Sequence, residues 1–303
     1  MEKVVFISGA SSGIGYAVCQ EFAKSNYKIY AGSRNIESLT HLSEQFPNVY
    51  PVELDVTSTD SILRAKKVVE LDNDKLDILF NNAGTPCVVP ALEVDEKTLR
   101  SAFEVNVFGA INLVREFSHL VIKAKGVFAF TTSSGTLMPY PFSSINNASK
   151  SALSSYASTL ALEVKPFDVK VVNFITGGVK TENLEKSRRQ SQNLKKGLYV
   201  VDGKDIVSES MNSIDNSSFM TAETYAREAV KDINHALHGS DYKHEGNYFP
   251  RYRGHMARFT KAANFYFHRQ IIEGMLLAGF NLKESFSKLK KQRNEKPNDV
   301  SLS

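Results

Sequence analysis

Short runs of β-branched and aromatic residues alternate with helix-sized segments through the first 180 residues of the chain. Continuous apolar runs are typical of parallel strands covered on both faces, and the segments between them supply the crossover helices that parallel strands need. The sequence therefore predicts an α/β fold with a single doubly wound parallel sheet. The expected strands are 4–7, 28–31, 49–54, 76–80, 127–131 and 169–174, and the expected helices are 14–25, 36–46, 58–71, 98–124 and 145–165.

The later part of the chain has a different pattern. Residues 182–218 are polar and rich in Lys, Ser and Asn, which predicts a mobile lid or an insertion. Residues 221–238 return to a helical period, and the charged residues 288–303 are expected to fray. We expect one nucleotide-binding catalytic domain over residues 1–249 and a helical, partly apolar and basic C-terminal extension over residues 250–303.

Composition excludes several classes of protein. Hydrophobic residues make up 42% of the chain and charged residues 23%, as in an ordinary globular protein with a sizeable core. Cys19 and Cys87 lie far apart, so neither a disulfide scaffold nor a metal site is expected. The first strand begins almost at Met1, which leaves no room for a targeting peptide, and no stretch of about 20 apolar residues predicts a membrane-spanning helix. An intracellular protein is expected.

The net charge of +4 is unevenly distributed. Residues 250–303 contain 11 Lys and Arg against four Asp and Glu, a balance of +7, while the remainder contains 26 against 29, a balance of −3. A basic tail on a slightly acidic body suits an anionic partner such as a phosphate-bearing substrate or a membrane surface, although solvent alone is an equally good interpretation. We expect no nucleic-acid partner.

The segment Ser8-Gly9-Ala10-Ser11-Ser12-Gly13-Ile14-Gly15 joins the first expected strand directly to the first expected helix. Glycine is needed where the backbone turns tightly, approaches a pyrophosphate or packs on a sheet, and a helix N-terminus attracts the anion. Because the pattern lies inside a βαβ unit, it predicts a Rossmann dinucleotide site. The expected cofactor contacts here are Ser8, Gly9, Ser11, Ser12, Gly13, Ile14 and Gly15.

The same segment also contains the pattern G-x-S-x-G, which is the nucleophile elbow of serine hydrolases. A lipid hydrolase that uses Ser11 as its nucleophile is therefore an alternative. It is the weaker one, because dinucleotide binding already accounts for the same backbone.

The end of the second expected strand distinguishes NAD from NADP. NAD sites commonly have an acid there, which accepts hydrogen bonds from the ribose hydroxyls, but no acid follows until Glu37. Arg34 is a planar cation suited to a 2′-phosphate, and Ser33 adds a hydroxyl. The sequence therefore predicts NADP(H) as the cofactor.

Further motifs follow in a fixed order. They are Asp55-Val56 after the third strand, Asn81-Asn82-Ala83-Gly84 after the fourth, Asn106-Val107-Phe108-Gly109 in the long helix, Ser133 after the fifth strand and Lys150 in the next helix. Together with the glycine pattern, they make residues 3–182 resemble the short-chain dehydrogenase/reductase family. The resemblance implies a Rossmann fold and oxidoreduction with a nicotinamide cofactor.

Within that family, segments 76–84, 123–126 and 175–179 most resemble the fungal NADPH-dependent 1-acyl-dihydroxyacetone-phosphate reductases. The likeness extends to the segments around Tyr225 and Tyr252. It implies reduction of the ketone of an acylated, phosphorylated substrate, giving 1-acyl-glycerol 3-phosphate in phospholipid and ether-lipid synthesis. It also implies a location at the endoplasmic reticulum membrane and the lipid-droplet surface.

The resemblance assigns roles to individual residues. Asp55 would bind near the adenine, Asn82 would hold the ribose side of the cofactor, and Asn106 would position a proton-relay water. Ser133 would donate a hydrogen bond to the substrate carbonyl, and Lys150 would bind the nicotinamide ribose. The remaining expected cofactor contacts lie in the segment after the sixth strand and are Gly178, Val179 and Thr181.

One position departs from the family pattern. The family has a tyrosine four residues before the active-site lysine, where one helical turn brings both side chains to the same face and the ammonium lowers the phenol pKa. Here Asn146 stands at that position. An amide donates hydrogen bonds but cannot deliver a proton near neutral pH. Turnover would then depend on a water or on Lys150, and the alternative is an NADP(H)-binding pseudoenzyme.

Tyr140 is the nearest tyrosine before this helix. It lies ten residues before Lys150, with Pro141 between them. We expect it to share neither the helix nor the face of Lys150, and a rearranged loop is the alternative.

The C-terminal extension combines apolar and aromatic residues with Arg258, Lys261, Arg269 and Lys283. Basic residues beside an apolar face suit an interfacial helix, which predicts peripheral membrane or lipid-droplet contact. Packing on the sheet, or a subunit contact in a homo-oligomer, is an equally good interpretation.

Overall fold

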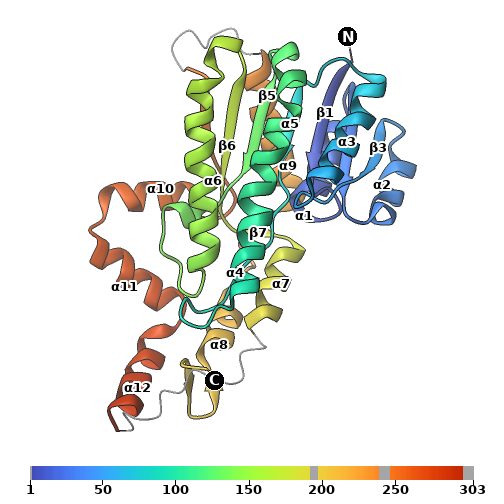
Figure 1. Cartoon of the computed structure of the whole chain (residues 1–303). Coiled ribbons are helices and arrows are strands. Elements are labelled where there is room, and N and C mark those ends of the chain that lie inside the picture. The colour runs from blue at the N-terminus through green and yellow to red at the C-terminus, as the bar shows by residue number, and fades with distance from the viewer. Residues whose placement is uncertain (1, 192–196, 239–245, 296–303) are drawn as a thin grey trace.

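The computed structural model describes residues 2–191, 197–238 and 246–295, so the fraying expected for residues 296–303 lies outside the described residues. Its centre is a seven-stranded parallel sheet with the order β11-β6-β5-β4-β1-β2-β3 (Figure 1). The predicted doubly wound α/β fold is confirmed. The strands are β1 (Lys3–Ser8), β2 (Tyr27–Ser33), β3 (Val49–Glu53), β4 (Ile78–Asn81), β5 (Val127–Thr131), β6 (Lys170–Thr176) and β11 (Tyr248–Arg253).

Of the seven strands of this sheet, the edge strand β11 is the one that the sequence pattern does not reveal. It pairs in parallel with β6 from Tyr248 to Arg253, so the sheet continues past the expected boundary after residue 249, which falls inside this strand. An edge strand tolerates proline and charge because one side of its backbone has no partner strand. Arg253 shows this, since its guanidinium donates to the Asp232 carboxylate at 2.7 Å.

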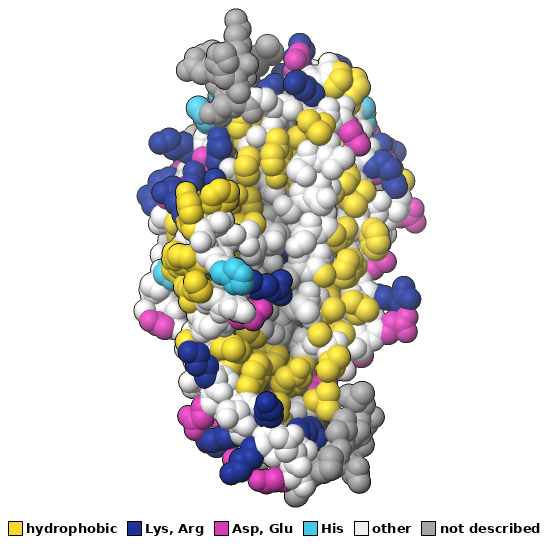
Figure 2. Space-filling view, turned by 90° about the vertical axis from the view of Figure 1, so that its left-hand side faces the viewer, with side chains coloured by type: hydrophobic (Ala, Val, Ile, Leu, Met, Phe, Trp, Pro, Cys, Tyr) yellow, Lys and Arg dark blue, Asp and Glu magenta, His cyan; other side chains and the backbone are white. Residues whose placement is uncertain are grey.

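The chain after β11 forms α10 (Ala257–Tyr266), α11 (Arg269–Gly279) and α12 (Leu282–Glu295). Figure 1 shows α10 and α11 beside α6 (Ser144–Glu163), and Figure 2 shows the surface of that side, where hydrophobic side chains gather around a hollow. The buried Leu282 joins α12 to α8 (Ile206–Ser213) through a separate apolar cluster. No described helix is both long and apolar enough to cross a membrane.

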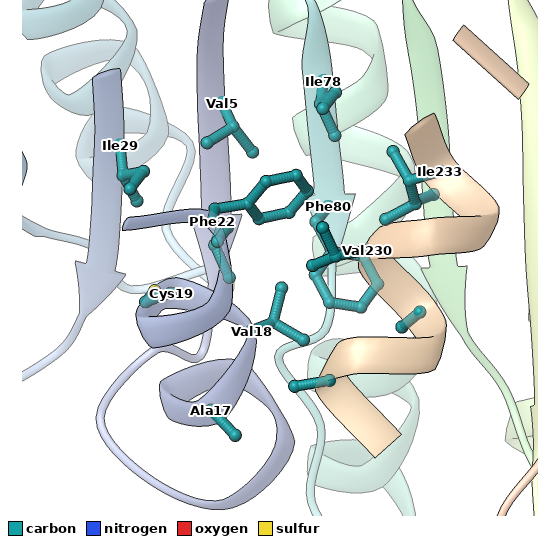
Figure 3. Packing of buried hydrophobic residues seen from close by; sticks show 14 of the residues in the cluster. Val5, Ala17, Val18, Cys19, Phe22, Ile29, Ile78, Phe80, Val230 and Ile233 are labelled. Atoms are coloured by element: carbon teal, nitrogen blue, oxygen red, sulfur yellow. The ribbon is translucent and has the colours of Figure 1, made fainter. Parts of the chain in front are cut away.

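Helices cover both faces of the sheet. On one face α1 (Gly13–Ala23) and α9 (Ala222–His238) pack together on the central strands, as the contacts of Phe22 and Val230 with Phe80 in Figure 3 illustrate. On the other face α3 (Thr59–Asp72), α5 (Gly109–Ala124) and α6 enclose a second apolar cluster. Burial of both faces explains why the strands are continuous apolar runs.

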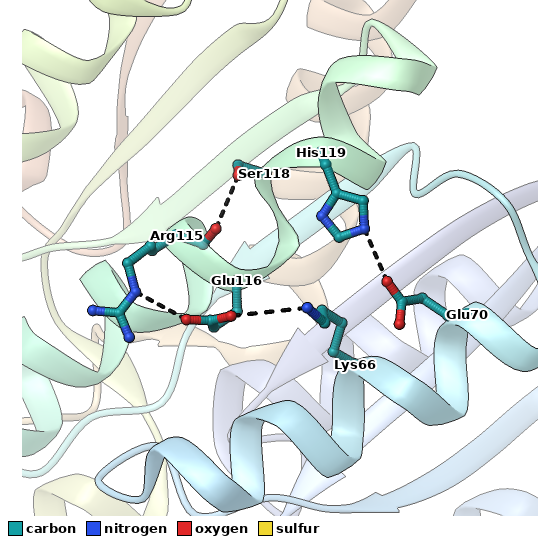
Figure 4. A network of polar contacts seen from close by, with 6 residues as sticks. All are labelled: Lys66, Glu70, Arg115, Glu116, Ser118 and His119. Atoms are coloured by element: carbon teal, nitrogen blue, oxygen red, sulfur yellow. Dashed lines mark hydrogen bonds and ion pairs between the residues drawn. The ribbon is translucent and has the colours of Figure 1, made fainter.

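Polar pairs on the outer surface join α3 to α5 (Figure 4). The Lys66 ammonium lies 3.8 Å from the Glu116 carboxylate, and His119 lies 2.9 Å from Glu70. Surface pairs of this kind contribute about 1 kcal/mol or less each, so the apolar cluster beneath them supplies most of the stability of this helix pair.

Three expected segments differ in detail. The helix expected at 98–124 is α4 (Glu96–Phe103), a π-helical turn (Glu104–Phe108) and α5, and the helix at 36–46 is a short 3₁₀ turn (Ile36–Leu39) followed by α2 (Thr40–Gln45). The expected insertion at 182–218 contains elements of its own. They are α7 (Glu182–Ser191), β8 (Val200–Val201), β9 (Lys204–Asp205) and α8, while β7 (Val179–Lys180) and β10 (Met220–Thr221) pair at its ends.

Candidate active site

A cleft of about 1020 Å³ lies at the carboxyl ends of the strands. Its centre is where the chain order reverses, because β1 has β2 on one side and β4 on the other. Ligands of open α/β sheets bind at such a point. The cleft brings together fifteen of the eighteen predicted site residues: Gly9, Ser11, Ser12, Gly13, Ile14, Ser33, Arg34, Asp55, Asn82, Ser133, Asn146, Lys150, Gly178, Val179 and Thr181.

The glycine turn between β1 and α1 has the geometry that its sequence requires. Gly9 and Gly13 have φ values of +67° and +56°, in the left-handed region that favours glycine. A Cβ on Gly9 would come within 2.8 Å of the Ala83 backbone, and one on Gly15 would collide with the Gly9 carbonyl oxygen. The turn is therefore packed tightly on itself and on the Ala83 backbone, and the unpaired N–H groups at the start of α1 favour an anion.

Three of the predicted residues do not line the cleft, namely Ser8, Gly15 and Asn106. Ser8 is buried behind the turn, where its hydroxyl accepts hydrogen bonds from the backbone N–H groups of Asn82 and Ala83, each at 3.1 Å. Gly15 is placed by close packing on the turn. Both residues support the turn without lining the cleft. A sequence motif cannot distinguish such a supporting residue from one that contacts the ligand.

Asn82 has a structural role that its motif did not reveal. Its amide nitrogen donates to the carbonyl oxygens of Ser8 and Gly9 at 3.2 and 3.1 Å, and its amide oxygen accepts from the Thr131 hydroxyl at 3.2 Å. The side chain therefore holds the ends of three neighbouring strands together beneath the cleft.

Asn106 lies fully buried in the π-helical turn. Its side chain accepts from the Thr85 N–H at 2.8 Å and donates to the Thr85 carbonyl at 3.0 Å and to the Ser149 hydroxyl at 3.1 Å. The amide is thus committed to joining the β4 loop to α6. π-Helical turns inside α-helices are frequent at functional sites, because the extra residue disturbs the regular backbone ladder.

The end of β2 presents cationic and hydroxyl groups to the cleft. Arg34 is exposed and, among the residues that the structure describes, pairs with no acid. Ser33 lies beside it with its hydroxyl 3.2 Å from the Ser38 hydroxyl. Asp55, after β3, uses one carboxylate oxygen to accept from the backbone and hydroxyl of Thr57 at 2.9 and 2.7 Å, which orients the carboxylate.

Ser133 follows β5 and caps a short 3₁₀ turn (Ser134–Thr136). Its Oγ accepts a hydrogen bond from the Gly135 N–H at 3.0 Å. Since that contact uses the oxygen as an acceptor, the hydroxyl hydrogen remains available for a ligand in the cleft. The serine is therefore oriented as a donor.

Lys150 comes from α6, and its side chain is almost fully buried. Its Nζ donates to the Thr131 carbonyl at 2.9 Å, and a Cβ on Gly84 would lie 3.2 Å from that nitrogen. Burial away from water lowers the pKa of Lys150 to about 8. The ammonium is consequently charged at pH 7 but can release its proton slightly above it.

Asn146 lies one helical turn before Lys150 and lines the same cleft. Its side chain makes no hydrogen bond to any residue that the structure describes, while its backbone carbonyl accepts from the Ser149 hydroxyl at 2.9 Å. Ser133, Asn146 and Lys150 thus surround one end of the cleft with hydrogen-bond donors.

Tyr140 also lines this cleft, which sequence reasoning did not predict. It precedes α6, as expected, but its loop folds back so that the hydroxyl lies 3.2 Å from the Ser134 hydroxyl. Burial raises the pKa of Tyr140, and no charged group opposes this shift. Tyr140 is therefore held as a neutral phenol, unlike the tyrosine of the family pattern, which a lysine activates.

Other residues of the cleft carry no motif. His255 follows β11, exchanges backbone hydrogen bonds with Gly178 at 3.1 and 2.8 Å, and stacks on the Phe219 ring. Lys186 of α7 also lines the cleft. Four apolar residues of the C-terminal extension also line the cleft: Phe259, Met275, Leu276 and Phe280. The apolar pattern of that extension was the one sequence signal for them.

Residues 3–192 match the short chain dehydrogenase family. The match covers more than half of the chain, and the glycine turn, Ser133 and Lys150 fall within it. The chain belongs to this family of NAD(P)-type Rossmann enzymes, which confirms the resemblance inferred from its motifs.

The chain is similar to the NADPH-dependent 1-acyldihydroxyacetone phosphate reductase of Saccharomyces cerevisiae, with 35% identity over 97% of both chains. The protein of the same description from Schizosaccharomyces pombe is 36% identical over 60% of this chain and 61% of that one. Among solved structures, a short chain dehydrogenase from Burkholderia cenocepacia in complex with NADP is 25% identical, with a TM-score of 0.66 over 91% of this chain and 98% of that one.

Proposed function

We propose that this protein is an NADPH-dependent reductase that converts 1-acyl-dihydroxyacetone phosphate to 1-acyl-glycerol 3-phosphate. The observation that carries the proposal is the end-to-end similarity to the Saccharomyces cerevisiae reductase together with a cleft that combines a dinucleotide cradle, Ser133 and Lys150. The family alone would support an oxidoreductase of some kind.

The residues present fit NADP(H). The glycine turn packs so closely on the Ala83 backbone and on itself that Cβ atoms on Gly9 and Gly15 would collide there, and the start of α1 offers N–H groups to a pyrophosphate. Arg34, unpaired with any described acid, and the Ser33 hydroxyl suit the 2′-phosphate that distinguishes NADP from NAD. When bound, the cofactor supplies a hydride to a carbonyl carbon.

The chain's own residues position the carbonyl. Ser133 donates a hydrogen bond to its oxygen, and the Asn146 amide offers a second donor from the same end of the cleft. Lys150 keeps a positive charge nearby at pH 7 and is the nearest acid with a pKa close to working pH, about 8. The proton reaches the alkoxide from Lys150 or through water.

The cleft suits a substrate that has both an anionic group and an apolar chain. Lys186 and His255 are among the lining residues and can donate hydrogen bonds to a phosphate, although Asp215 lines the cleft as well. The apolar residues of α10 and α11 form another wall. An acylated, phosphorylated ketone has both characters.

The alternatives receive less support. A pseudoenzyme that binds NADP(H) without turnover remains motivated by Asn146 alone, since the relatives are described as reductases and dehydrogenases. For the hydrolase, Ser11 makes no hydrogen bond to a histidine among the described residues. Such a base is required to activate a serine.

The purified protein should oxidise NADPH in the presence of 1-acyl-dihydroxyacetone phosphate, followed by absorbance loss and by mass spectrometry of the product. Lys150→Met should abolish this activity. Tight NADPH binding without product, at neutral and acidic pH, would favour the pseudoenzyme instead.

We also propose peripheral contact with a lipid surface, at the endoplasmic reticulum or lipid droplets. Phe265 and Tyr266 are 80% and 76% exposed on α10, and Ile271 of α11 is 53% exposed. Lys261 and Arg269 stand beside them. Exposed aromatic and aliphatic residues bordered by cations are typical of an interfacial anchor.

A further inference from the structure

The candidate active site continues into an apolar groove. The ring of Phe280 lies 6.1 Å from the ring of Tyr140, whose hydroxyl contacts Ser134, the neighbour of Ser133. From there the wall of the cleft is formed by Met211, Ile214, Phe259, Leu276 and Met275. These apolar side chains share the cleft lining with polar residues such as Asp215 and Thr260.

The walls of this groove are fixed by packing. Met211 of α8 belongs to a buried cluster with Leu282 at the start of α12, and Phe280 packs against the same cluster. Ile272 of α11 is only 5% exposed. Helix α11 is thus held at both ends, so the groove is a preformed feature of the fold.

The groove also reaches the exterior. Met275 lines the cleft and is at the same time 38% exposed, one turn from the exposed Ile271. Figure 2 shows hydrophobic side chains around the hollow on this side of the molecule. Met275 therefore belongs both to the lining of the cleft and to the exposed apolar face of α11.

We propose that the groove between α8, α10 and α11 binds the acyl chain of the substrate and admits it from the exposed apolar face. The identity of the substrate rests on the proposed function, whereas the binding of an acyl chain in the groove does not. A flexible hydrocarbon chain fits because the lining offers apolar contact and few hydrogen-bond partners. Each methylene that leaves water should strengthen binding by up to about fourfold.

Two glycines of α11 provide a matched test. Gly279 lines the cleft, and a Cβ built on it meets nothing within 4 Å, so a larger side chain can be placed at this edge of the groove without displacing backbone. Gly274 lies on the same helix with equally open surroundings but does not line the cleft. Neither has a positive φ, so both accept a side chain.

The test measures binding of the fluorescent fatty acid cis-parinaric acid to cofactor-free wild type, Gly279→Phe and Gly274→Phe. We expect micromolar binding to wild type, displacement by palmitate at far lower concentration than by octanoate, at least tenfold weaker binding to Gly279→Phe, and a change within twofold in Gly274→Phe. NADPH affinity and the melting temperature of each variant establish that it is folded. Equal binding to both variants, or no binding to the wild type, would overturn the proposal.

Acyl-chain kinetics separate this proposal from the proposed function. If NADPH oxidation fails for every acyl-dihydroxyacetone phosphate while probe binding still depends on Gly279, the reductase assignment falls and the groove is supported. If NADPH oxidation proceeds with the same kcat/KM for short and long acyl chains, the reductase stands and the acyl groove is refuted. In a supported groove, Gly279→Phe reduces the preference for long chains over short ones.

Discussion

Replacing Asn146 by tyrosine would restore the donor that the family pattern has and this chain lacks. Residues four apart on α6 lie on one face with their Cβ atoms about 6 Å apart, and we assume the same separation between the new hydroxyl and the Lys150 ammonium. At that distance and an effective dielectric constant of about 20, the attraction between phenolate and ammonium is about 3 kcal/mol. It lowers the phenol pKa by about 2 units, from about 10 to about 8.

A phenol with that pKa is a competent acid at neutral pH, so Asn146→Tyr should raise kcat about 100-fold, the lower end of what general acid catalysis contributes. The assay is NADPH consumption with 1-acyl-dihydroxyacetone phosphate, measured from pH 6 to 9. The rate should fall as pH rises through about 8, because the phenol and Lys150 then lose their protons.

Asn146→Phe is the matched control, because it adds the same ring without the hydroxyl. It should leave kcat at or below the wild-type value, with NADPH affinity unchanged in both variants. An equal rate increase in both variants would mean that the ring acts through packing. No increase in either would mean that proton supply does not limit this enzyme, and the reasoning about Asn146 would be wrong.

Three other measurements test separate parts of the structure. Arg34→Ala should weaken NADPH binding about 10- to 100-fold and leave NADH binding unchanged, because a charged hydrogen bond to the 2′-phosphate contributes about 1.5–3 kcal/mol. Nucleotide fluorescence measures both affinities. An equal loss for both nucleotides would contradict this role. Lys150 has a folded pKa of about 8 against an ordinary 10.5, so its burial costs up to about 3 kcal/mol below pH 8 and progressively less as pH rises toward 10.5. Lys150→Met should therefore be more stable to urea at pH 7 by up to that amount, with the difference shrinking at higher pH, and a less stable variant at pH 7 would refute it. The double variant Phe265→Ser with Ile271→Ser should no longer sediment with anionic phospholipid vesicles. Leu162 is a comparably exposed apolar residue on α6, and Leu162→Ser should still sediment. Retained binding of the double variant would exclude this anchor.

The central strands and the dinucleotide cradle could be predicted from the sequence because each has a local physical cause. A strand buried on both faces must be a continuous apolar run, and β5 was bounded correctly for that reason. The left-handed φ of Gly9 and Gly13 selects glycine whatever the rest of the fold does. The edge strand β11 has no such signature, because Pro250 and its arginines are tolerated only where one strand side is unpaired.

The wider site could be predicted only in part, because side chains reach it from segments that are distant in sequence. His255 enters the cleft through a backbone pairing with Gly178, and Tyr140 enters through the fold-back of a loop. Neither contact has a sequence pattern. Conversely, Ser8 and Asn106 belong to motifs of the family pattern, but their side chains bond to neighbouring parts of the protein and do not line the cleft.

The structure also changes how the missing tyrosine is understood. Loss of the phenol does not dismantle the site, because Ser133 is oriented by Gly135 and Lys150 is held by Thr131, and neither contact involves residue 146. In the family pattern the lysine activates the tyrosine, whereas here its desolvated ammonium has a pKa of about 8 and faces the cleft with an amide donor one turn away. In the proposed reductase, such an arrangement would keep the groups that bind and polarise the carbonyl and would leave only the final proton to a weaker route. A slow reductase with an intact site is therefore the expected consequence of Asn146, and it differs measurably from a pseudoenzyme, in which the orienting contacts of Ser133 and Lys150 would serve no reaction.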